Sequence, residues 1–140
     1  MSGDTYKTAP PDQVQYGPTP ATAEGGPLTA RQLSRLDEAL TFSSRETGLT
    51  FSVYLGEFHA PSRAHAEALF EKLTDDAVLV AVSPGQRVLH IVTGTNSARR
   101  LPNRACALAA LAMRASFASG DLTGGIVTGL RMLADSAGGR

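Results

Sequence analysis

Charged side chains form two short clusters that could bind an ion. Asp75 and Asp76 are adjacent, and the stretch VTGTNSARRLPN places Gly94, Arg99 and Arg100 between an apolar run and an alanine-rich segment. Paired carboxylates with loop carbonyls suit a hard cation such as Ca²⁺ or Mg²⁺. Guanidinium groups beside the free N–H groups of a helix start suit a phosphate or carboxylate. A surface ion-pair cluster around a turn is the third interpretation.

The elements that position these clusters follow from residue patterns. Thr29 and Gln32 form a capping-box pattern ahead of an amphipathic helix that Gly48 is placed to end. Residues 50–55 alternate as a strand, and Ser62 is placed to cap a second helix. An apolar run over 77–83 and a second over 88–93 then predict two further strands.

The two later strands flank Pro84-Gly85, which suits a hairpin with a type II turn. The stretch NRACALAALAMRASF is apolar almost all round, which predicts a largely buried helix. A last helix follows Asp121, and its small Gly125 and Gly129 predict close packing against a neighbour. We therefore expect an α/β fold: a three-layer α/β/α sandwich with a small mixed sheet, made of a parallel β-α-β unit plus an antiparallel hairpin, with helices on both faces.

Strand direction assigns the loops to two edges of this sheet. Residues 56–59 and Ser83 follow the two parallel strands, at the edge where open α/β sheets usually bind ligands. The third strand runs backwards, so its following loop lies at the opposite edge, where the two aspartates precede the second strand. The candidate metal ligands are Asp75 and Asp76, and the candidate anion or ligand residues are Gly94, Asn96, Arg99, Arg100 and Asn103.

Other side chains that could do chemistry have no partner fixed by spacing. Glu57 and His59 could serve as acid and base, but no nucleophile is placed beside them. We expect His90 to be a hydrogen-bonded strand residue, His65 a helix surface residue, and Cys106 an unreactive thiol on an apolar helix. The sequence contains no GxxxxGK[ST], no GxGxxG after a strand, no HExxH and no GxSxG, which removes support for the common nucleotide-binding and hydrolase classes.

Composition bounds the class of protein. The chain has 140 residues, 42% of them apolar, and 13 basic residues balance 13 acidic ones, so its overall charge would not attract nucleic acid. Residues 1–27 are rich in proline and glycine and predict a flexible tail, and 28–140 predict one domain. The single cysteine, the lack of a signal-like start and the lack of a long apolar run predict a cytoplasmic protein without membrane insertion.

Several segments together resemble the TPM-domain family, in particular its uncharacterised actinobacterial branch. They are ETGLTFSVYLG, AEALF, DDAVLVAVSPGQRVLHIVTG, ARRLPNRACALAALAM and FASGDLTGGIVTGLRMLA, and the similarity runs from about residue 28 to 137. The resemblance implies a three-layer α/β sandwich. It also implies phosphatase activity, calcium binding or an accessory role in membrane complexes, because members of the family are described in each of these ways.

The sequence departs from the family pattern at the proposed ion site. Members commonly have an acidic residue soon after the glycine that ends the third strand, and an aspartate opening the next helix. Here Gly94 is followed by Thr95 and Asn96, and Asn103 opens the helix. Fewer carboxylates lower the affinity for divalent cations. We therefore expect a TPM-like binding or accessory module with an unidentified protein partner and no certain cofactor; the alternatives are a weak metal-dependent phosphatase and a homo-oligomeric scaffold that uses the last helix.

Overall fold

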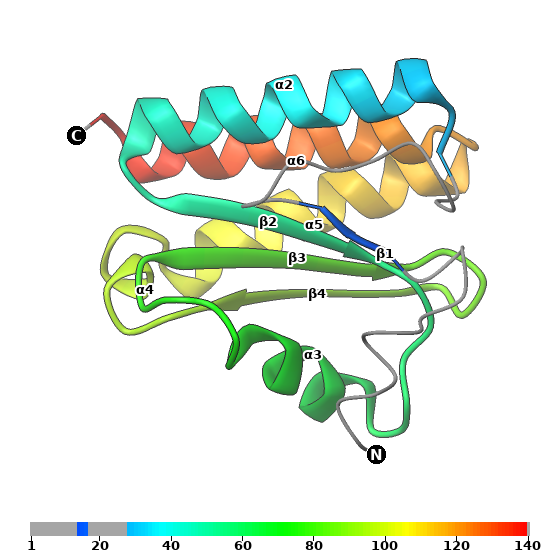
Figure 1. Ribbon diagram of the computed structural model, residues 1–140, viewed down its shortest axis with the longest axis horizontal. Coiled ribbons are helices and arrows are strands. Elements are labelled where there is room, and N and C mark those ends of the chain that lie inside the picture. Colours follow the sequence, from blue (N-terminus) through cyan, green and yellow to red (C-terminus); the bar gives the residue numbers. More distant parts are fainter. Residues whose placement is uncertain (1–13, 17–27, 140) are drawn as a thin grey trace.

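The computed structural model describes residues 14–16 and 28–139 and has a layered α/β architecture (Figure 1). Helices α2, α5 and α6 cover one face of the sheet, and α3 covers the other. This arrangement confirms the α/β/α sandwich with helices on both faces. The elements are β1 (Val14–Tyr16), α2 (Ala30–Thr47), β2 (Thr50–Leu55), α3 (Ser62–Phe70), β3 (Ala77–Ser83), β4 (Val88–Thr93), α4 (Ser97–Arg100), α5 (Asn103–Ala118) and α6 (Leu122–Ala137).

The sheet is mixed, and its strand order is β1-β2-β3-β4. Strands β2 and β3 are parallel, with Phe51 opposite Val78, and β4 runs antiparallel to β3, with Ile91 opposite Val80. The predicted β-α-β unit and hairpin are thus confirmed. Every residue of β3 is buried, as expected for a central strand covered on both faces.

Two hydrophobic clusters fill the space on either side of the sheet. The larger one joins Phe51 and Val80 to the inward faces of the three helices, including Leu36 and Leu130. The smaller one packs Leu79, with Ala81 and Val92, beneath α3. Neighbouring residues of β3 belong to opposite clusters, because side chains alternate along a strand.

Helix ends follow the predicted capping residues. The Thr29 hydroxyl accepts from the Gln32 N–H, and the Gln32 side chain accepts in return from the Thr29 N–H, which is a complete capping box. Gly48 ends α2 with a φ of 81°, and the Asp121 carboxylate accepts from the Gly124 N–H at the start of α6. These local predictions hold because each depends on residues within one turn of the helix end.

The predicted flexible tail, residues 1–27, is corrected at one point. Val14–Tyr16 form β1, which pairs antiparallel with β2 at the edge of the sheet. The segment is too short for a sequence pattern to stand out, and the outer edge of β2 supplies its backbone partners. The rest of the predicted tail lies outside the described residues.

The predicted type II turn at Pro84-Gly85 is wrong. Ser83 pairs with Val88, so the hairpin loop contains four residues, and the Arg87 N–H donates to the Pro84 carbonyl. The left-handed residue is Arg87, with a φ of 58°, and not Gly85. Four-residue hairpin loops are usually built around a type I turn, which does not need a positive φ at the glycine.

The relative burial of the last two long helices also differs from expectation. Helix α6 lies between α2 and α5 and is buried along most of its length, so the proposed scaffold surface on this helix is not available. Helix α5, expected to be largely buried, exposes Leu108 (49%) and Leu111 (65%). Helix α6 is the more buried of the two because Gly125 and Gly129 let it approach the side chains of Phe117 and Met113 on α5. None of the described helices is long and apolar enough to cross a membrane.

Strand β4 forms one edge of the sheet, and two arginines bond to its outward carbonyls. Arg63 of α3 donates to the Ile91 carbonyl over 3.2 Å, and Arg114 of α5 contacts the Leu89 carbonyl at 3.5 Å. The two arginines reach the strand from opposite faces of the sheet. They satisfy acceptors that a neighbouring strand would otherwise use.

Replacing Gly94 by alanine should destabilise the fold. A Cβ at this position would lie 2.5 Å from the Asp75 carbonyl oxygen and 2.8 Å from its Cα, and backbone atoms cannot move away cheaply. We expect a loss of about 1–3 kcal/mol in the free energy of unfolding, measured by urea denaturation. Gly85→Ala is the control, because no atom lies within 4 Å of the added Cβ; a comparable loss in both variants would contradict the steric explanation.

Candidate functional site

The predicted ion site lies where the segment 94–97 meets the turn before β3. The Asp75 carbonyl accepts from the Asn96 and Ser97 N–H groups, each over 3.1 Å, and Gly94 packs against the Asp75 backbone. The buried Ser97 hydroxyl donates to the Ala77 carbonyl over 2.7 Å and accepts from the Gly94 N–H. The expected proximity of the two segments is confirmed, and backbone hydrogen bonds hold them together.

Arg100, a candidate anion ligand, is instead bonded to the ends of two helices. Its guanidinium donates to the Thr47 carbonyl of α2 over 2.7 Å, and to three successive carbonyls at the end of α6, those of Ala137, Gly138 and Gly139. The last carbonyls of a helix lack intrahelical partners and carry partial negative charge. Arg100 therefore acts as a C-terminal cap for α2 and α6 together, and these bonds occupy its donors.

The other predicted residues at this edge are exposed. Asp75, Asp76 and Arg99 face solvent, as does Asn96, and Asn103 begins α5 without a capping side chain before it. Within the described part of the chain, no three His, Cys, Asp or Glu side chains gather closely enough to hold a metal ion. The metal and anion sites at this edge stay predictions.

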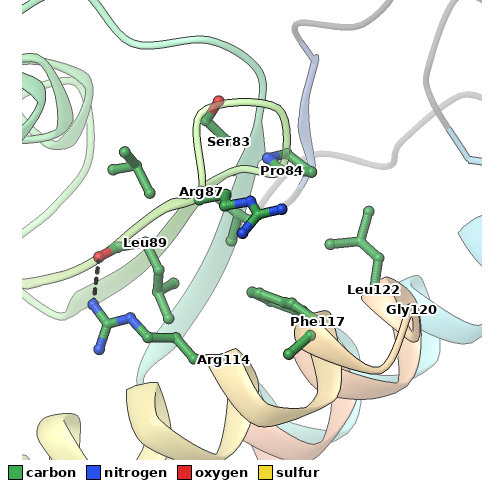
Figure 2. A pocket seen from close by; sticks show the side chains of 11 residues that line it. Ser83, Pro84, Arg87, Leu89, Arg114, Phe117, Gly120 and Leu122 are labelled. Atoms are coloured by element: carbon green, nitrogen blue, oxygen red, sulfur yellow. Dashed lines mark hydrogen bonds between the residues drawn. The ribbon is translucent and has the colours of Figure 1, made fainter.

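A pocket of about 510 Å³ lies at the opposite edge of the sheet, at the end of β3 (Figure 2). It separates the β3–β4 hairpin from the corner between α5 and α6. We call it the hairpin pocket. Its lining includes Ser83, Pro84 and Arg87 from the hairpin and Arg114, Phe117 and Leu122 from the helical corner.

Two arginines give the otherwise apolar hairpin pocket its charge. Figure 2 shows the Arg87 guanidinium directed into the space between the hairpin and Phe117, and Arg114 below it, bonded to the Leu89 carbonyl. Among the described residues, no carboxylate pairs with either arginine. Sequence reasoning placed Ser83 at this edge but missed both arginines, since only the packing of α5 against the hairpin brings them together.

The conformation of Arg87 adds weight to this site. A φ of 58° costs an arginine about 1–2 kcal/mol, whereas glycine adopts it without steric cost. The chain nevertheless has an arginine there, with its charged end at the pocket. Backbone strain of this kind often accompanies a functional side chain.

The three histidines lie on the other face of the sheet, around Phe58. His65, expected on the helix surface, is buried, and its Nδ1 accepts from the His59 N–H over 2.9 Å. It packs edge-on against Phe58 and stacks with the His59 ring, so this side of α3 faces inward. His90 is hydrogen-bonded, as expected, and its partner is the Ser62 hydroxyl.

Burial changes the acidity of two side chains, one on each side of the sheet. Burial, and secondly the neighbouring His59, lower the pKa of His65 below its usual value. On α5, burial raises the pKa of the Cys106 thiol, against a smaller opposing effect of Arg63, which agrees with the expected unreactive cysteine. His65 is therefore neutral at neutral pH.

Comparison with known proteins shows the family of this chain. Residues 16–134 match the model of a domain of unknown function, DUF5130, and the chain belongs to this family. Two uncharacterised proteins of Mycobacterium tuberculosis, MT2543 and Rv2468c, are each 35% identical over 109 residues, which is 76% of this chain and 65% of theirs. The chain thus spans about two thirds of the length of these relatives. The matched family is not named as a TPM family, and the TPM resemblance stays a prediction.

Solved structures share the fold at low sequence identity. The NMR structure of the BA42 protein from Bizionia argentinensis aligns with a TM-score of 0.67 and 18% identity, over 79% of this chain and 81% of that one. The N-terminal domain of the cg2496 protein from Corynebacterium glutamicum aligns with a TM-score of 0.66 and 15% identity, over 87% and 86%. These similarities confirm the architecture alone.

Replacing Arg100 by alanine should destabilise the protein without affecting the hairpin pocket. The variant leaves carbonyls at the ends of α2 and α6 without their charged donor, so we expect a loss of about 2–3 kcal/mol in the free energy of unfolding. Arg99→Ala, which removes the adjacent exposed arginine, is the matched control and should change it by less than about 0.5 kcal/mol. Equal effects of the two substitutions would contradict the capping role.

Stability should fall as the pH drops below about 6.5, the ordinary pKa of histidine. Because the folded-state pKa of His65 is lowered, the unfolded chain binds more protons in the window between the two values, and acidification favours unfolding there. His65→Gln should flatten the dependence, measured by urea denaturation at several pH values. His59→Gln should flatten it only in part, since this variant keeps the buried imidazole and removes the smaller of the two effects that lower its pKa; an unchanged slope in His65→Gln would refute this assignment.

Proposed function

We propose that this chain is a TPM-like binding module whose ligand is a small amphipathic carboxylate held in the hairpin pocket. The observation that carries this proposal is the meeting of Arg87 and Arg114 in a pocket otherwise lined by residues such as Phe117 and Leu122. Its position beside the carboxyl end of the parallel strand β3 supports it, because open α/β sheets usually bind ligands at that edge.

The lining suggests the chemistry of the ligand. A guanidinium pairs with a carboxylate through two parallel hydrogen bonds. Apolar side chains around the arginines favour a ligand with a hydrocarbon body. A volume of about 510 Å³ is within the range of small-molecule pockets. A short fatty acid has both parts, and so does an acidic residue beside an apolar one on a partner protein.

The alternative function, a weak metal-dependent phosphatase, has less support. Of its two expected phosphate ligands, Arg100 caps two helices and Arg99 is exposed, and Asp75 and Asp76 have no third ligand among the described His, Cys, Asp and Glu side chains. The zero net charge supports a partner other than nucleic acid. The single cysteine supports a place in the cytoplasm, as predicted.

Octanoate is a suitable probe for the hairpin pocket. We expect saturable amide shifts at residues 82–89 and 114–122 in a two-dimensional NMR titration. Arg87→Gln and Arg114→Gln should each weaken binding about tenfold, which corresponds to the loss of one charge-assisted hydrogen bond. Arg87→Gly should weaken it similarly and raise the free energy of unfolding by about 1 kcal/mol, because it relieves the positive φ.

Two controls separate this proposal from non-specific effects. Octanamide has the same length without the negative charge and should bind much more weakly. Arg99→Gln removes an exposed arginine at the other edge and should leave octanoate binding unchanged. Equal binding of octanamide, or no shifts in the named residues, would refute the proposal. Shifts at residues 74–76 during a Mg²⁺ and phosphate titration would favour the phosphatase instead.

A further inference from the structure

The face of the sheet under α3 brings together a hydroxyl and an imidazole. Ser62 begins α3 and His90 lies in the middle of β4, and the Ser62 Oγ is 2.7 Å from the His90 Nε2. This separation is within the range of a nucleophile and its general base. Both residues are partly exposed. The pair is on the opposite face from α5 and α6, and it is independent of the proposed function.

Ser62 is free for this contact because it does not cap its helix. The sequence predicts a Ser62 cap, but the N-cap is Pro61, and Ser62 is the first helical residue. No side chain caps α3, and the first backbone bond of the helix is from the His65 N–H to the Pro61 carbonyl. The N–H groups of Arg63 and Ala64 therefore lie at the same helix end as the Ser62 hydroxyl, where they can donate to an oxyanion.

The surroundings of His90 favour its neutral form. Burial lowers its pKa, and the positive charges of Arg63 and Arg114 lower it further, against a smaller opposing effect of Glu67. The edge of the Phe58 ring packs against the imidazole, with ring centres 5.7 Å apart. A neutral imidazole at neutral pH can accept a proton, and the tautomer with hydrogen on Nδ1 leaves Nε2 free to accept from Ser62.

We propose that Ser62 and His90 form a nucleophile–base pair that hydrolyses small activated esters. The Ser62 oxygen forms a bond to the ester carbonyl carbon while His90 Nε2 takes the hydroxyl proton. The bond from that carbon to the leaving oxygen then breaks, and the imidazolium returns the proton to the leaving alkoxide. Water repeats the steps on the acyl-serine: His90 takes its proton, the acid is released, and Ser62 regains its hydrogen.

The pair is a dyad in the described structure. None of the described carboxylates is hydrogen-bonded to His90, and Glu67, the acidic residue that affects its pKa, is paired with Arg63 over 3.2 Å. A serine–histidine pair without an orienting acid keeps the nucleophile and the base but loses part of the acceleration. Slow turnover and efficient covalent trapping of the serine are therefore the expected behaviour.

A fluorophosphonate probe tests the proposal on the full chain. The probe should add to one residue, which intact-mass and peptide mass spectrometry should locate at Ser62. Ser62→Ala should abolish the labelling, and His90→Gln should slow it at least about 100-fold, the usual minimum contribution of a general base. Hydrolysis of p-nitrophenyl acetate should fall in parallel. Ser119→Ala removes an exposed hydroxyl at the end of α5 that bonds only locally, and it should label normally.

The pH profile and the mapped site separate reactivity from a purely structural bond. The labelling rate should rise through an apparent pKa below about 6.5 and then stay level, as expected for a lowered histidine pKa. A hydrogen bond with only a structural role gives a folded protein without label on Ser62, and that result would overturn the proposal. Peptide mass spectrometry of the labelled wild-type protein tests the proposal even if Ser62→Ala does not fold, since label on a residue other than Ser62 would refute the proposal.

Discussion

The fold depends on the burial of β3 on both faces. All seven residues of this strand are buried, and its alternate side chains belong to two separate hydrophobic clusters. Such a strand is stable only if both faces of the sheet are covered, because exposure of either row of apolar side chains to water costs about 25 cal/mol per Å². Three helices cover one face and α3 the other. Polar groups that could do chemistry consequently lie at the strand ends, on the outer strand β4 and on the helices.

The two ends of the sheet use arginine differently. At one end, Arg100 donates to carbonyls at the ends of two helices, so its charge stabilises the fold. At the other, Arg87 and Arg114 lie at the hairpin pocket, and the one hydrogen bond from their guanidinium groups to a described residue is that of Arg114 to the Leu89 carbonyl over 3.5 Å. A guanidinium with satisfied donors has little affinity left for an anion, whereas one at an apolar pocket gains by pairing. Composition cannot separate these cases, because the residue type is the same.

Patterns within a few residues predicted most of the architecture. The Thr29–Gln32 capping box, the stop at Gly48 and the direction of the hairpin depend on local geometry and were predicted correctly. The predictions failed where contacts between distant segments determine a residue's conformation or exposure. The positive φ of Arg87 depends on the length of the hairpin loop, and the exposure of Leu111 depends on which helix occupies the middle of its layer. The Ser62–His90 contact joins residues 28 positions apart, and no periodicity encodes it.

Arg63 and Arg114 have a consequence beyond their own hydrogen bonds, because they occupy the free side of the edge strand. An edge strand offers unpaired N–H and C=O groups on which another chain can assemble as an additional strand. Here the outward carbonyls of Ile91 and Leu89 each receive a guanidinium, one from each face of the sheet. The arginines thus make the β4 edge a poor template for a strand of a second molecule.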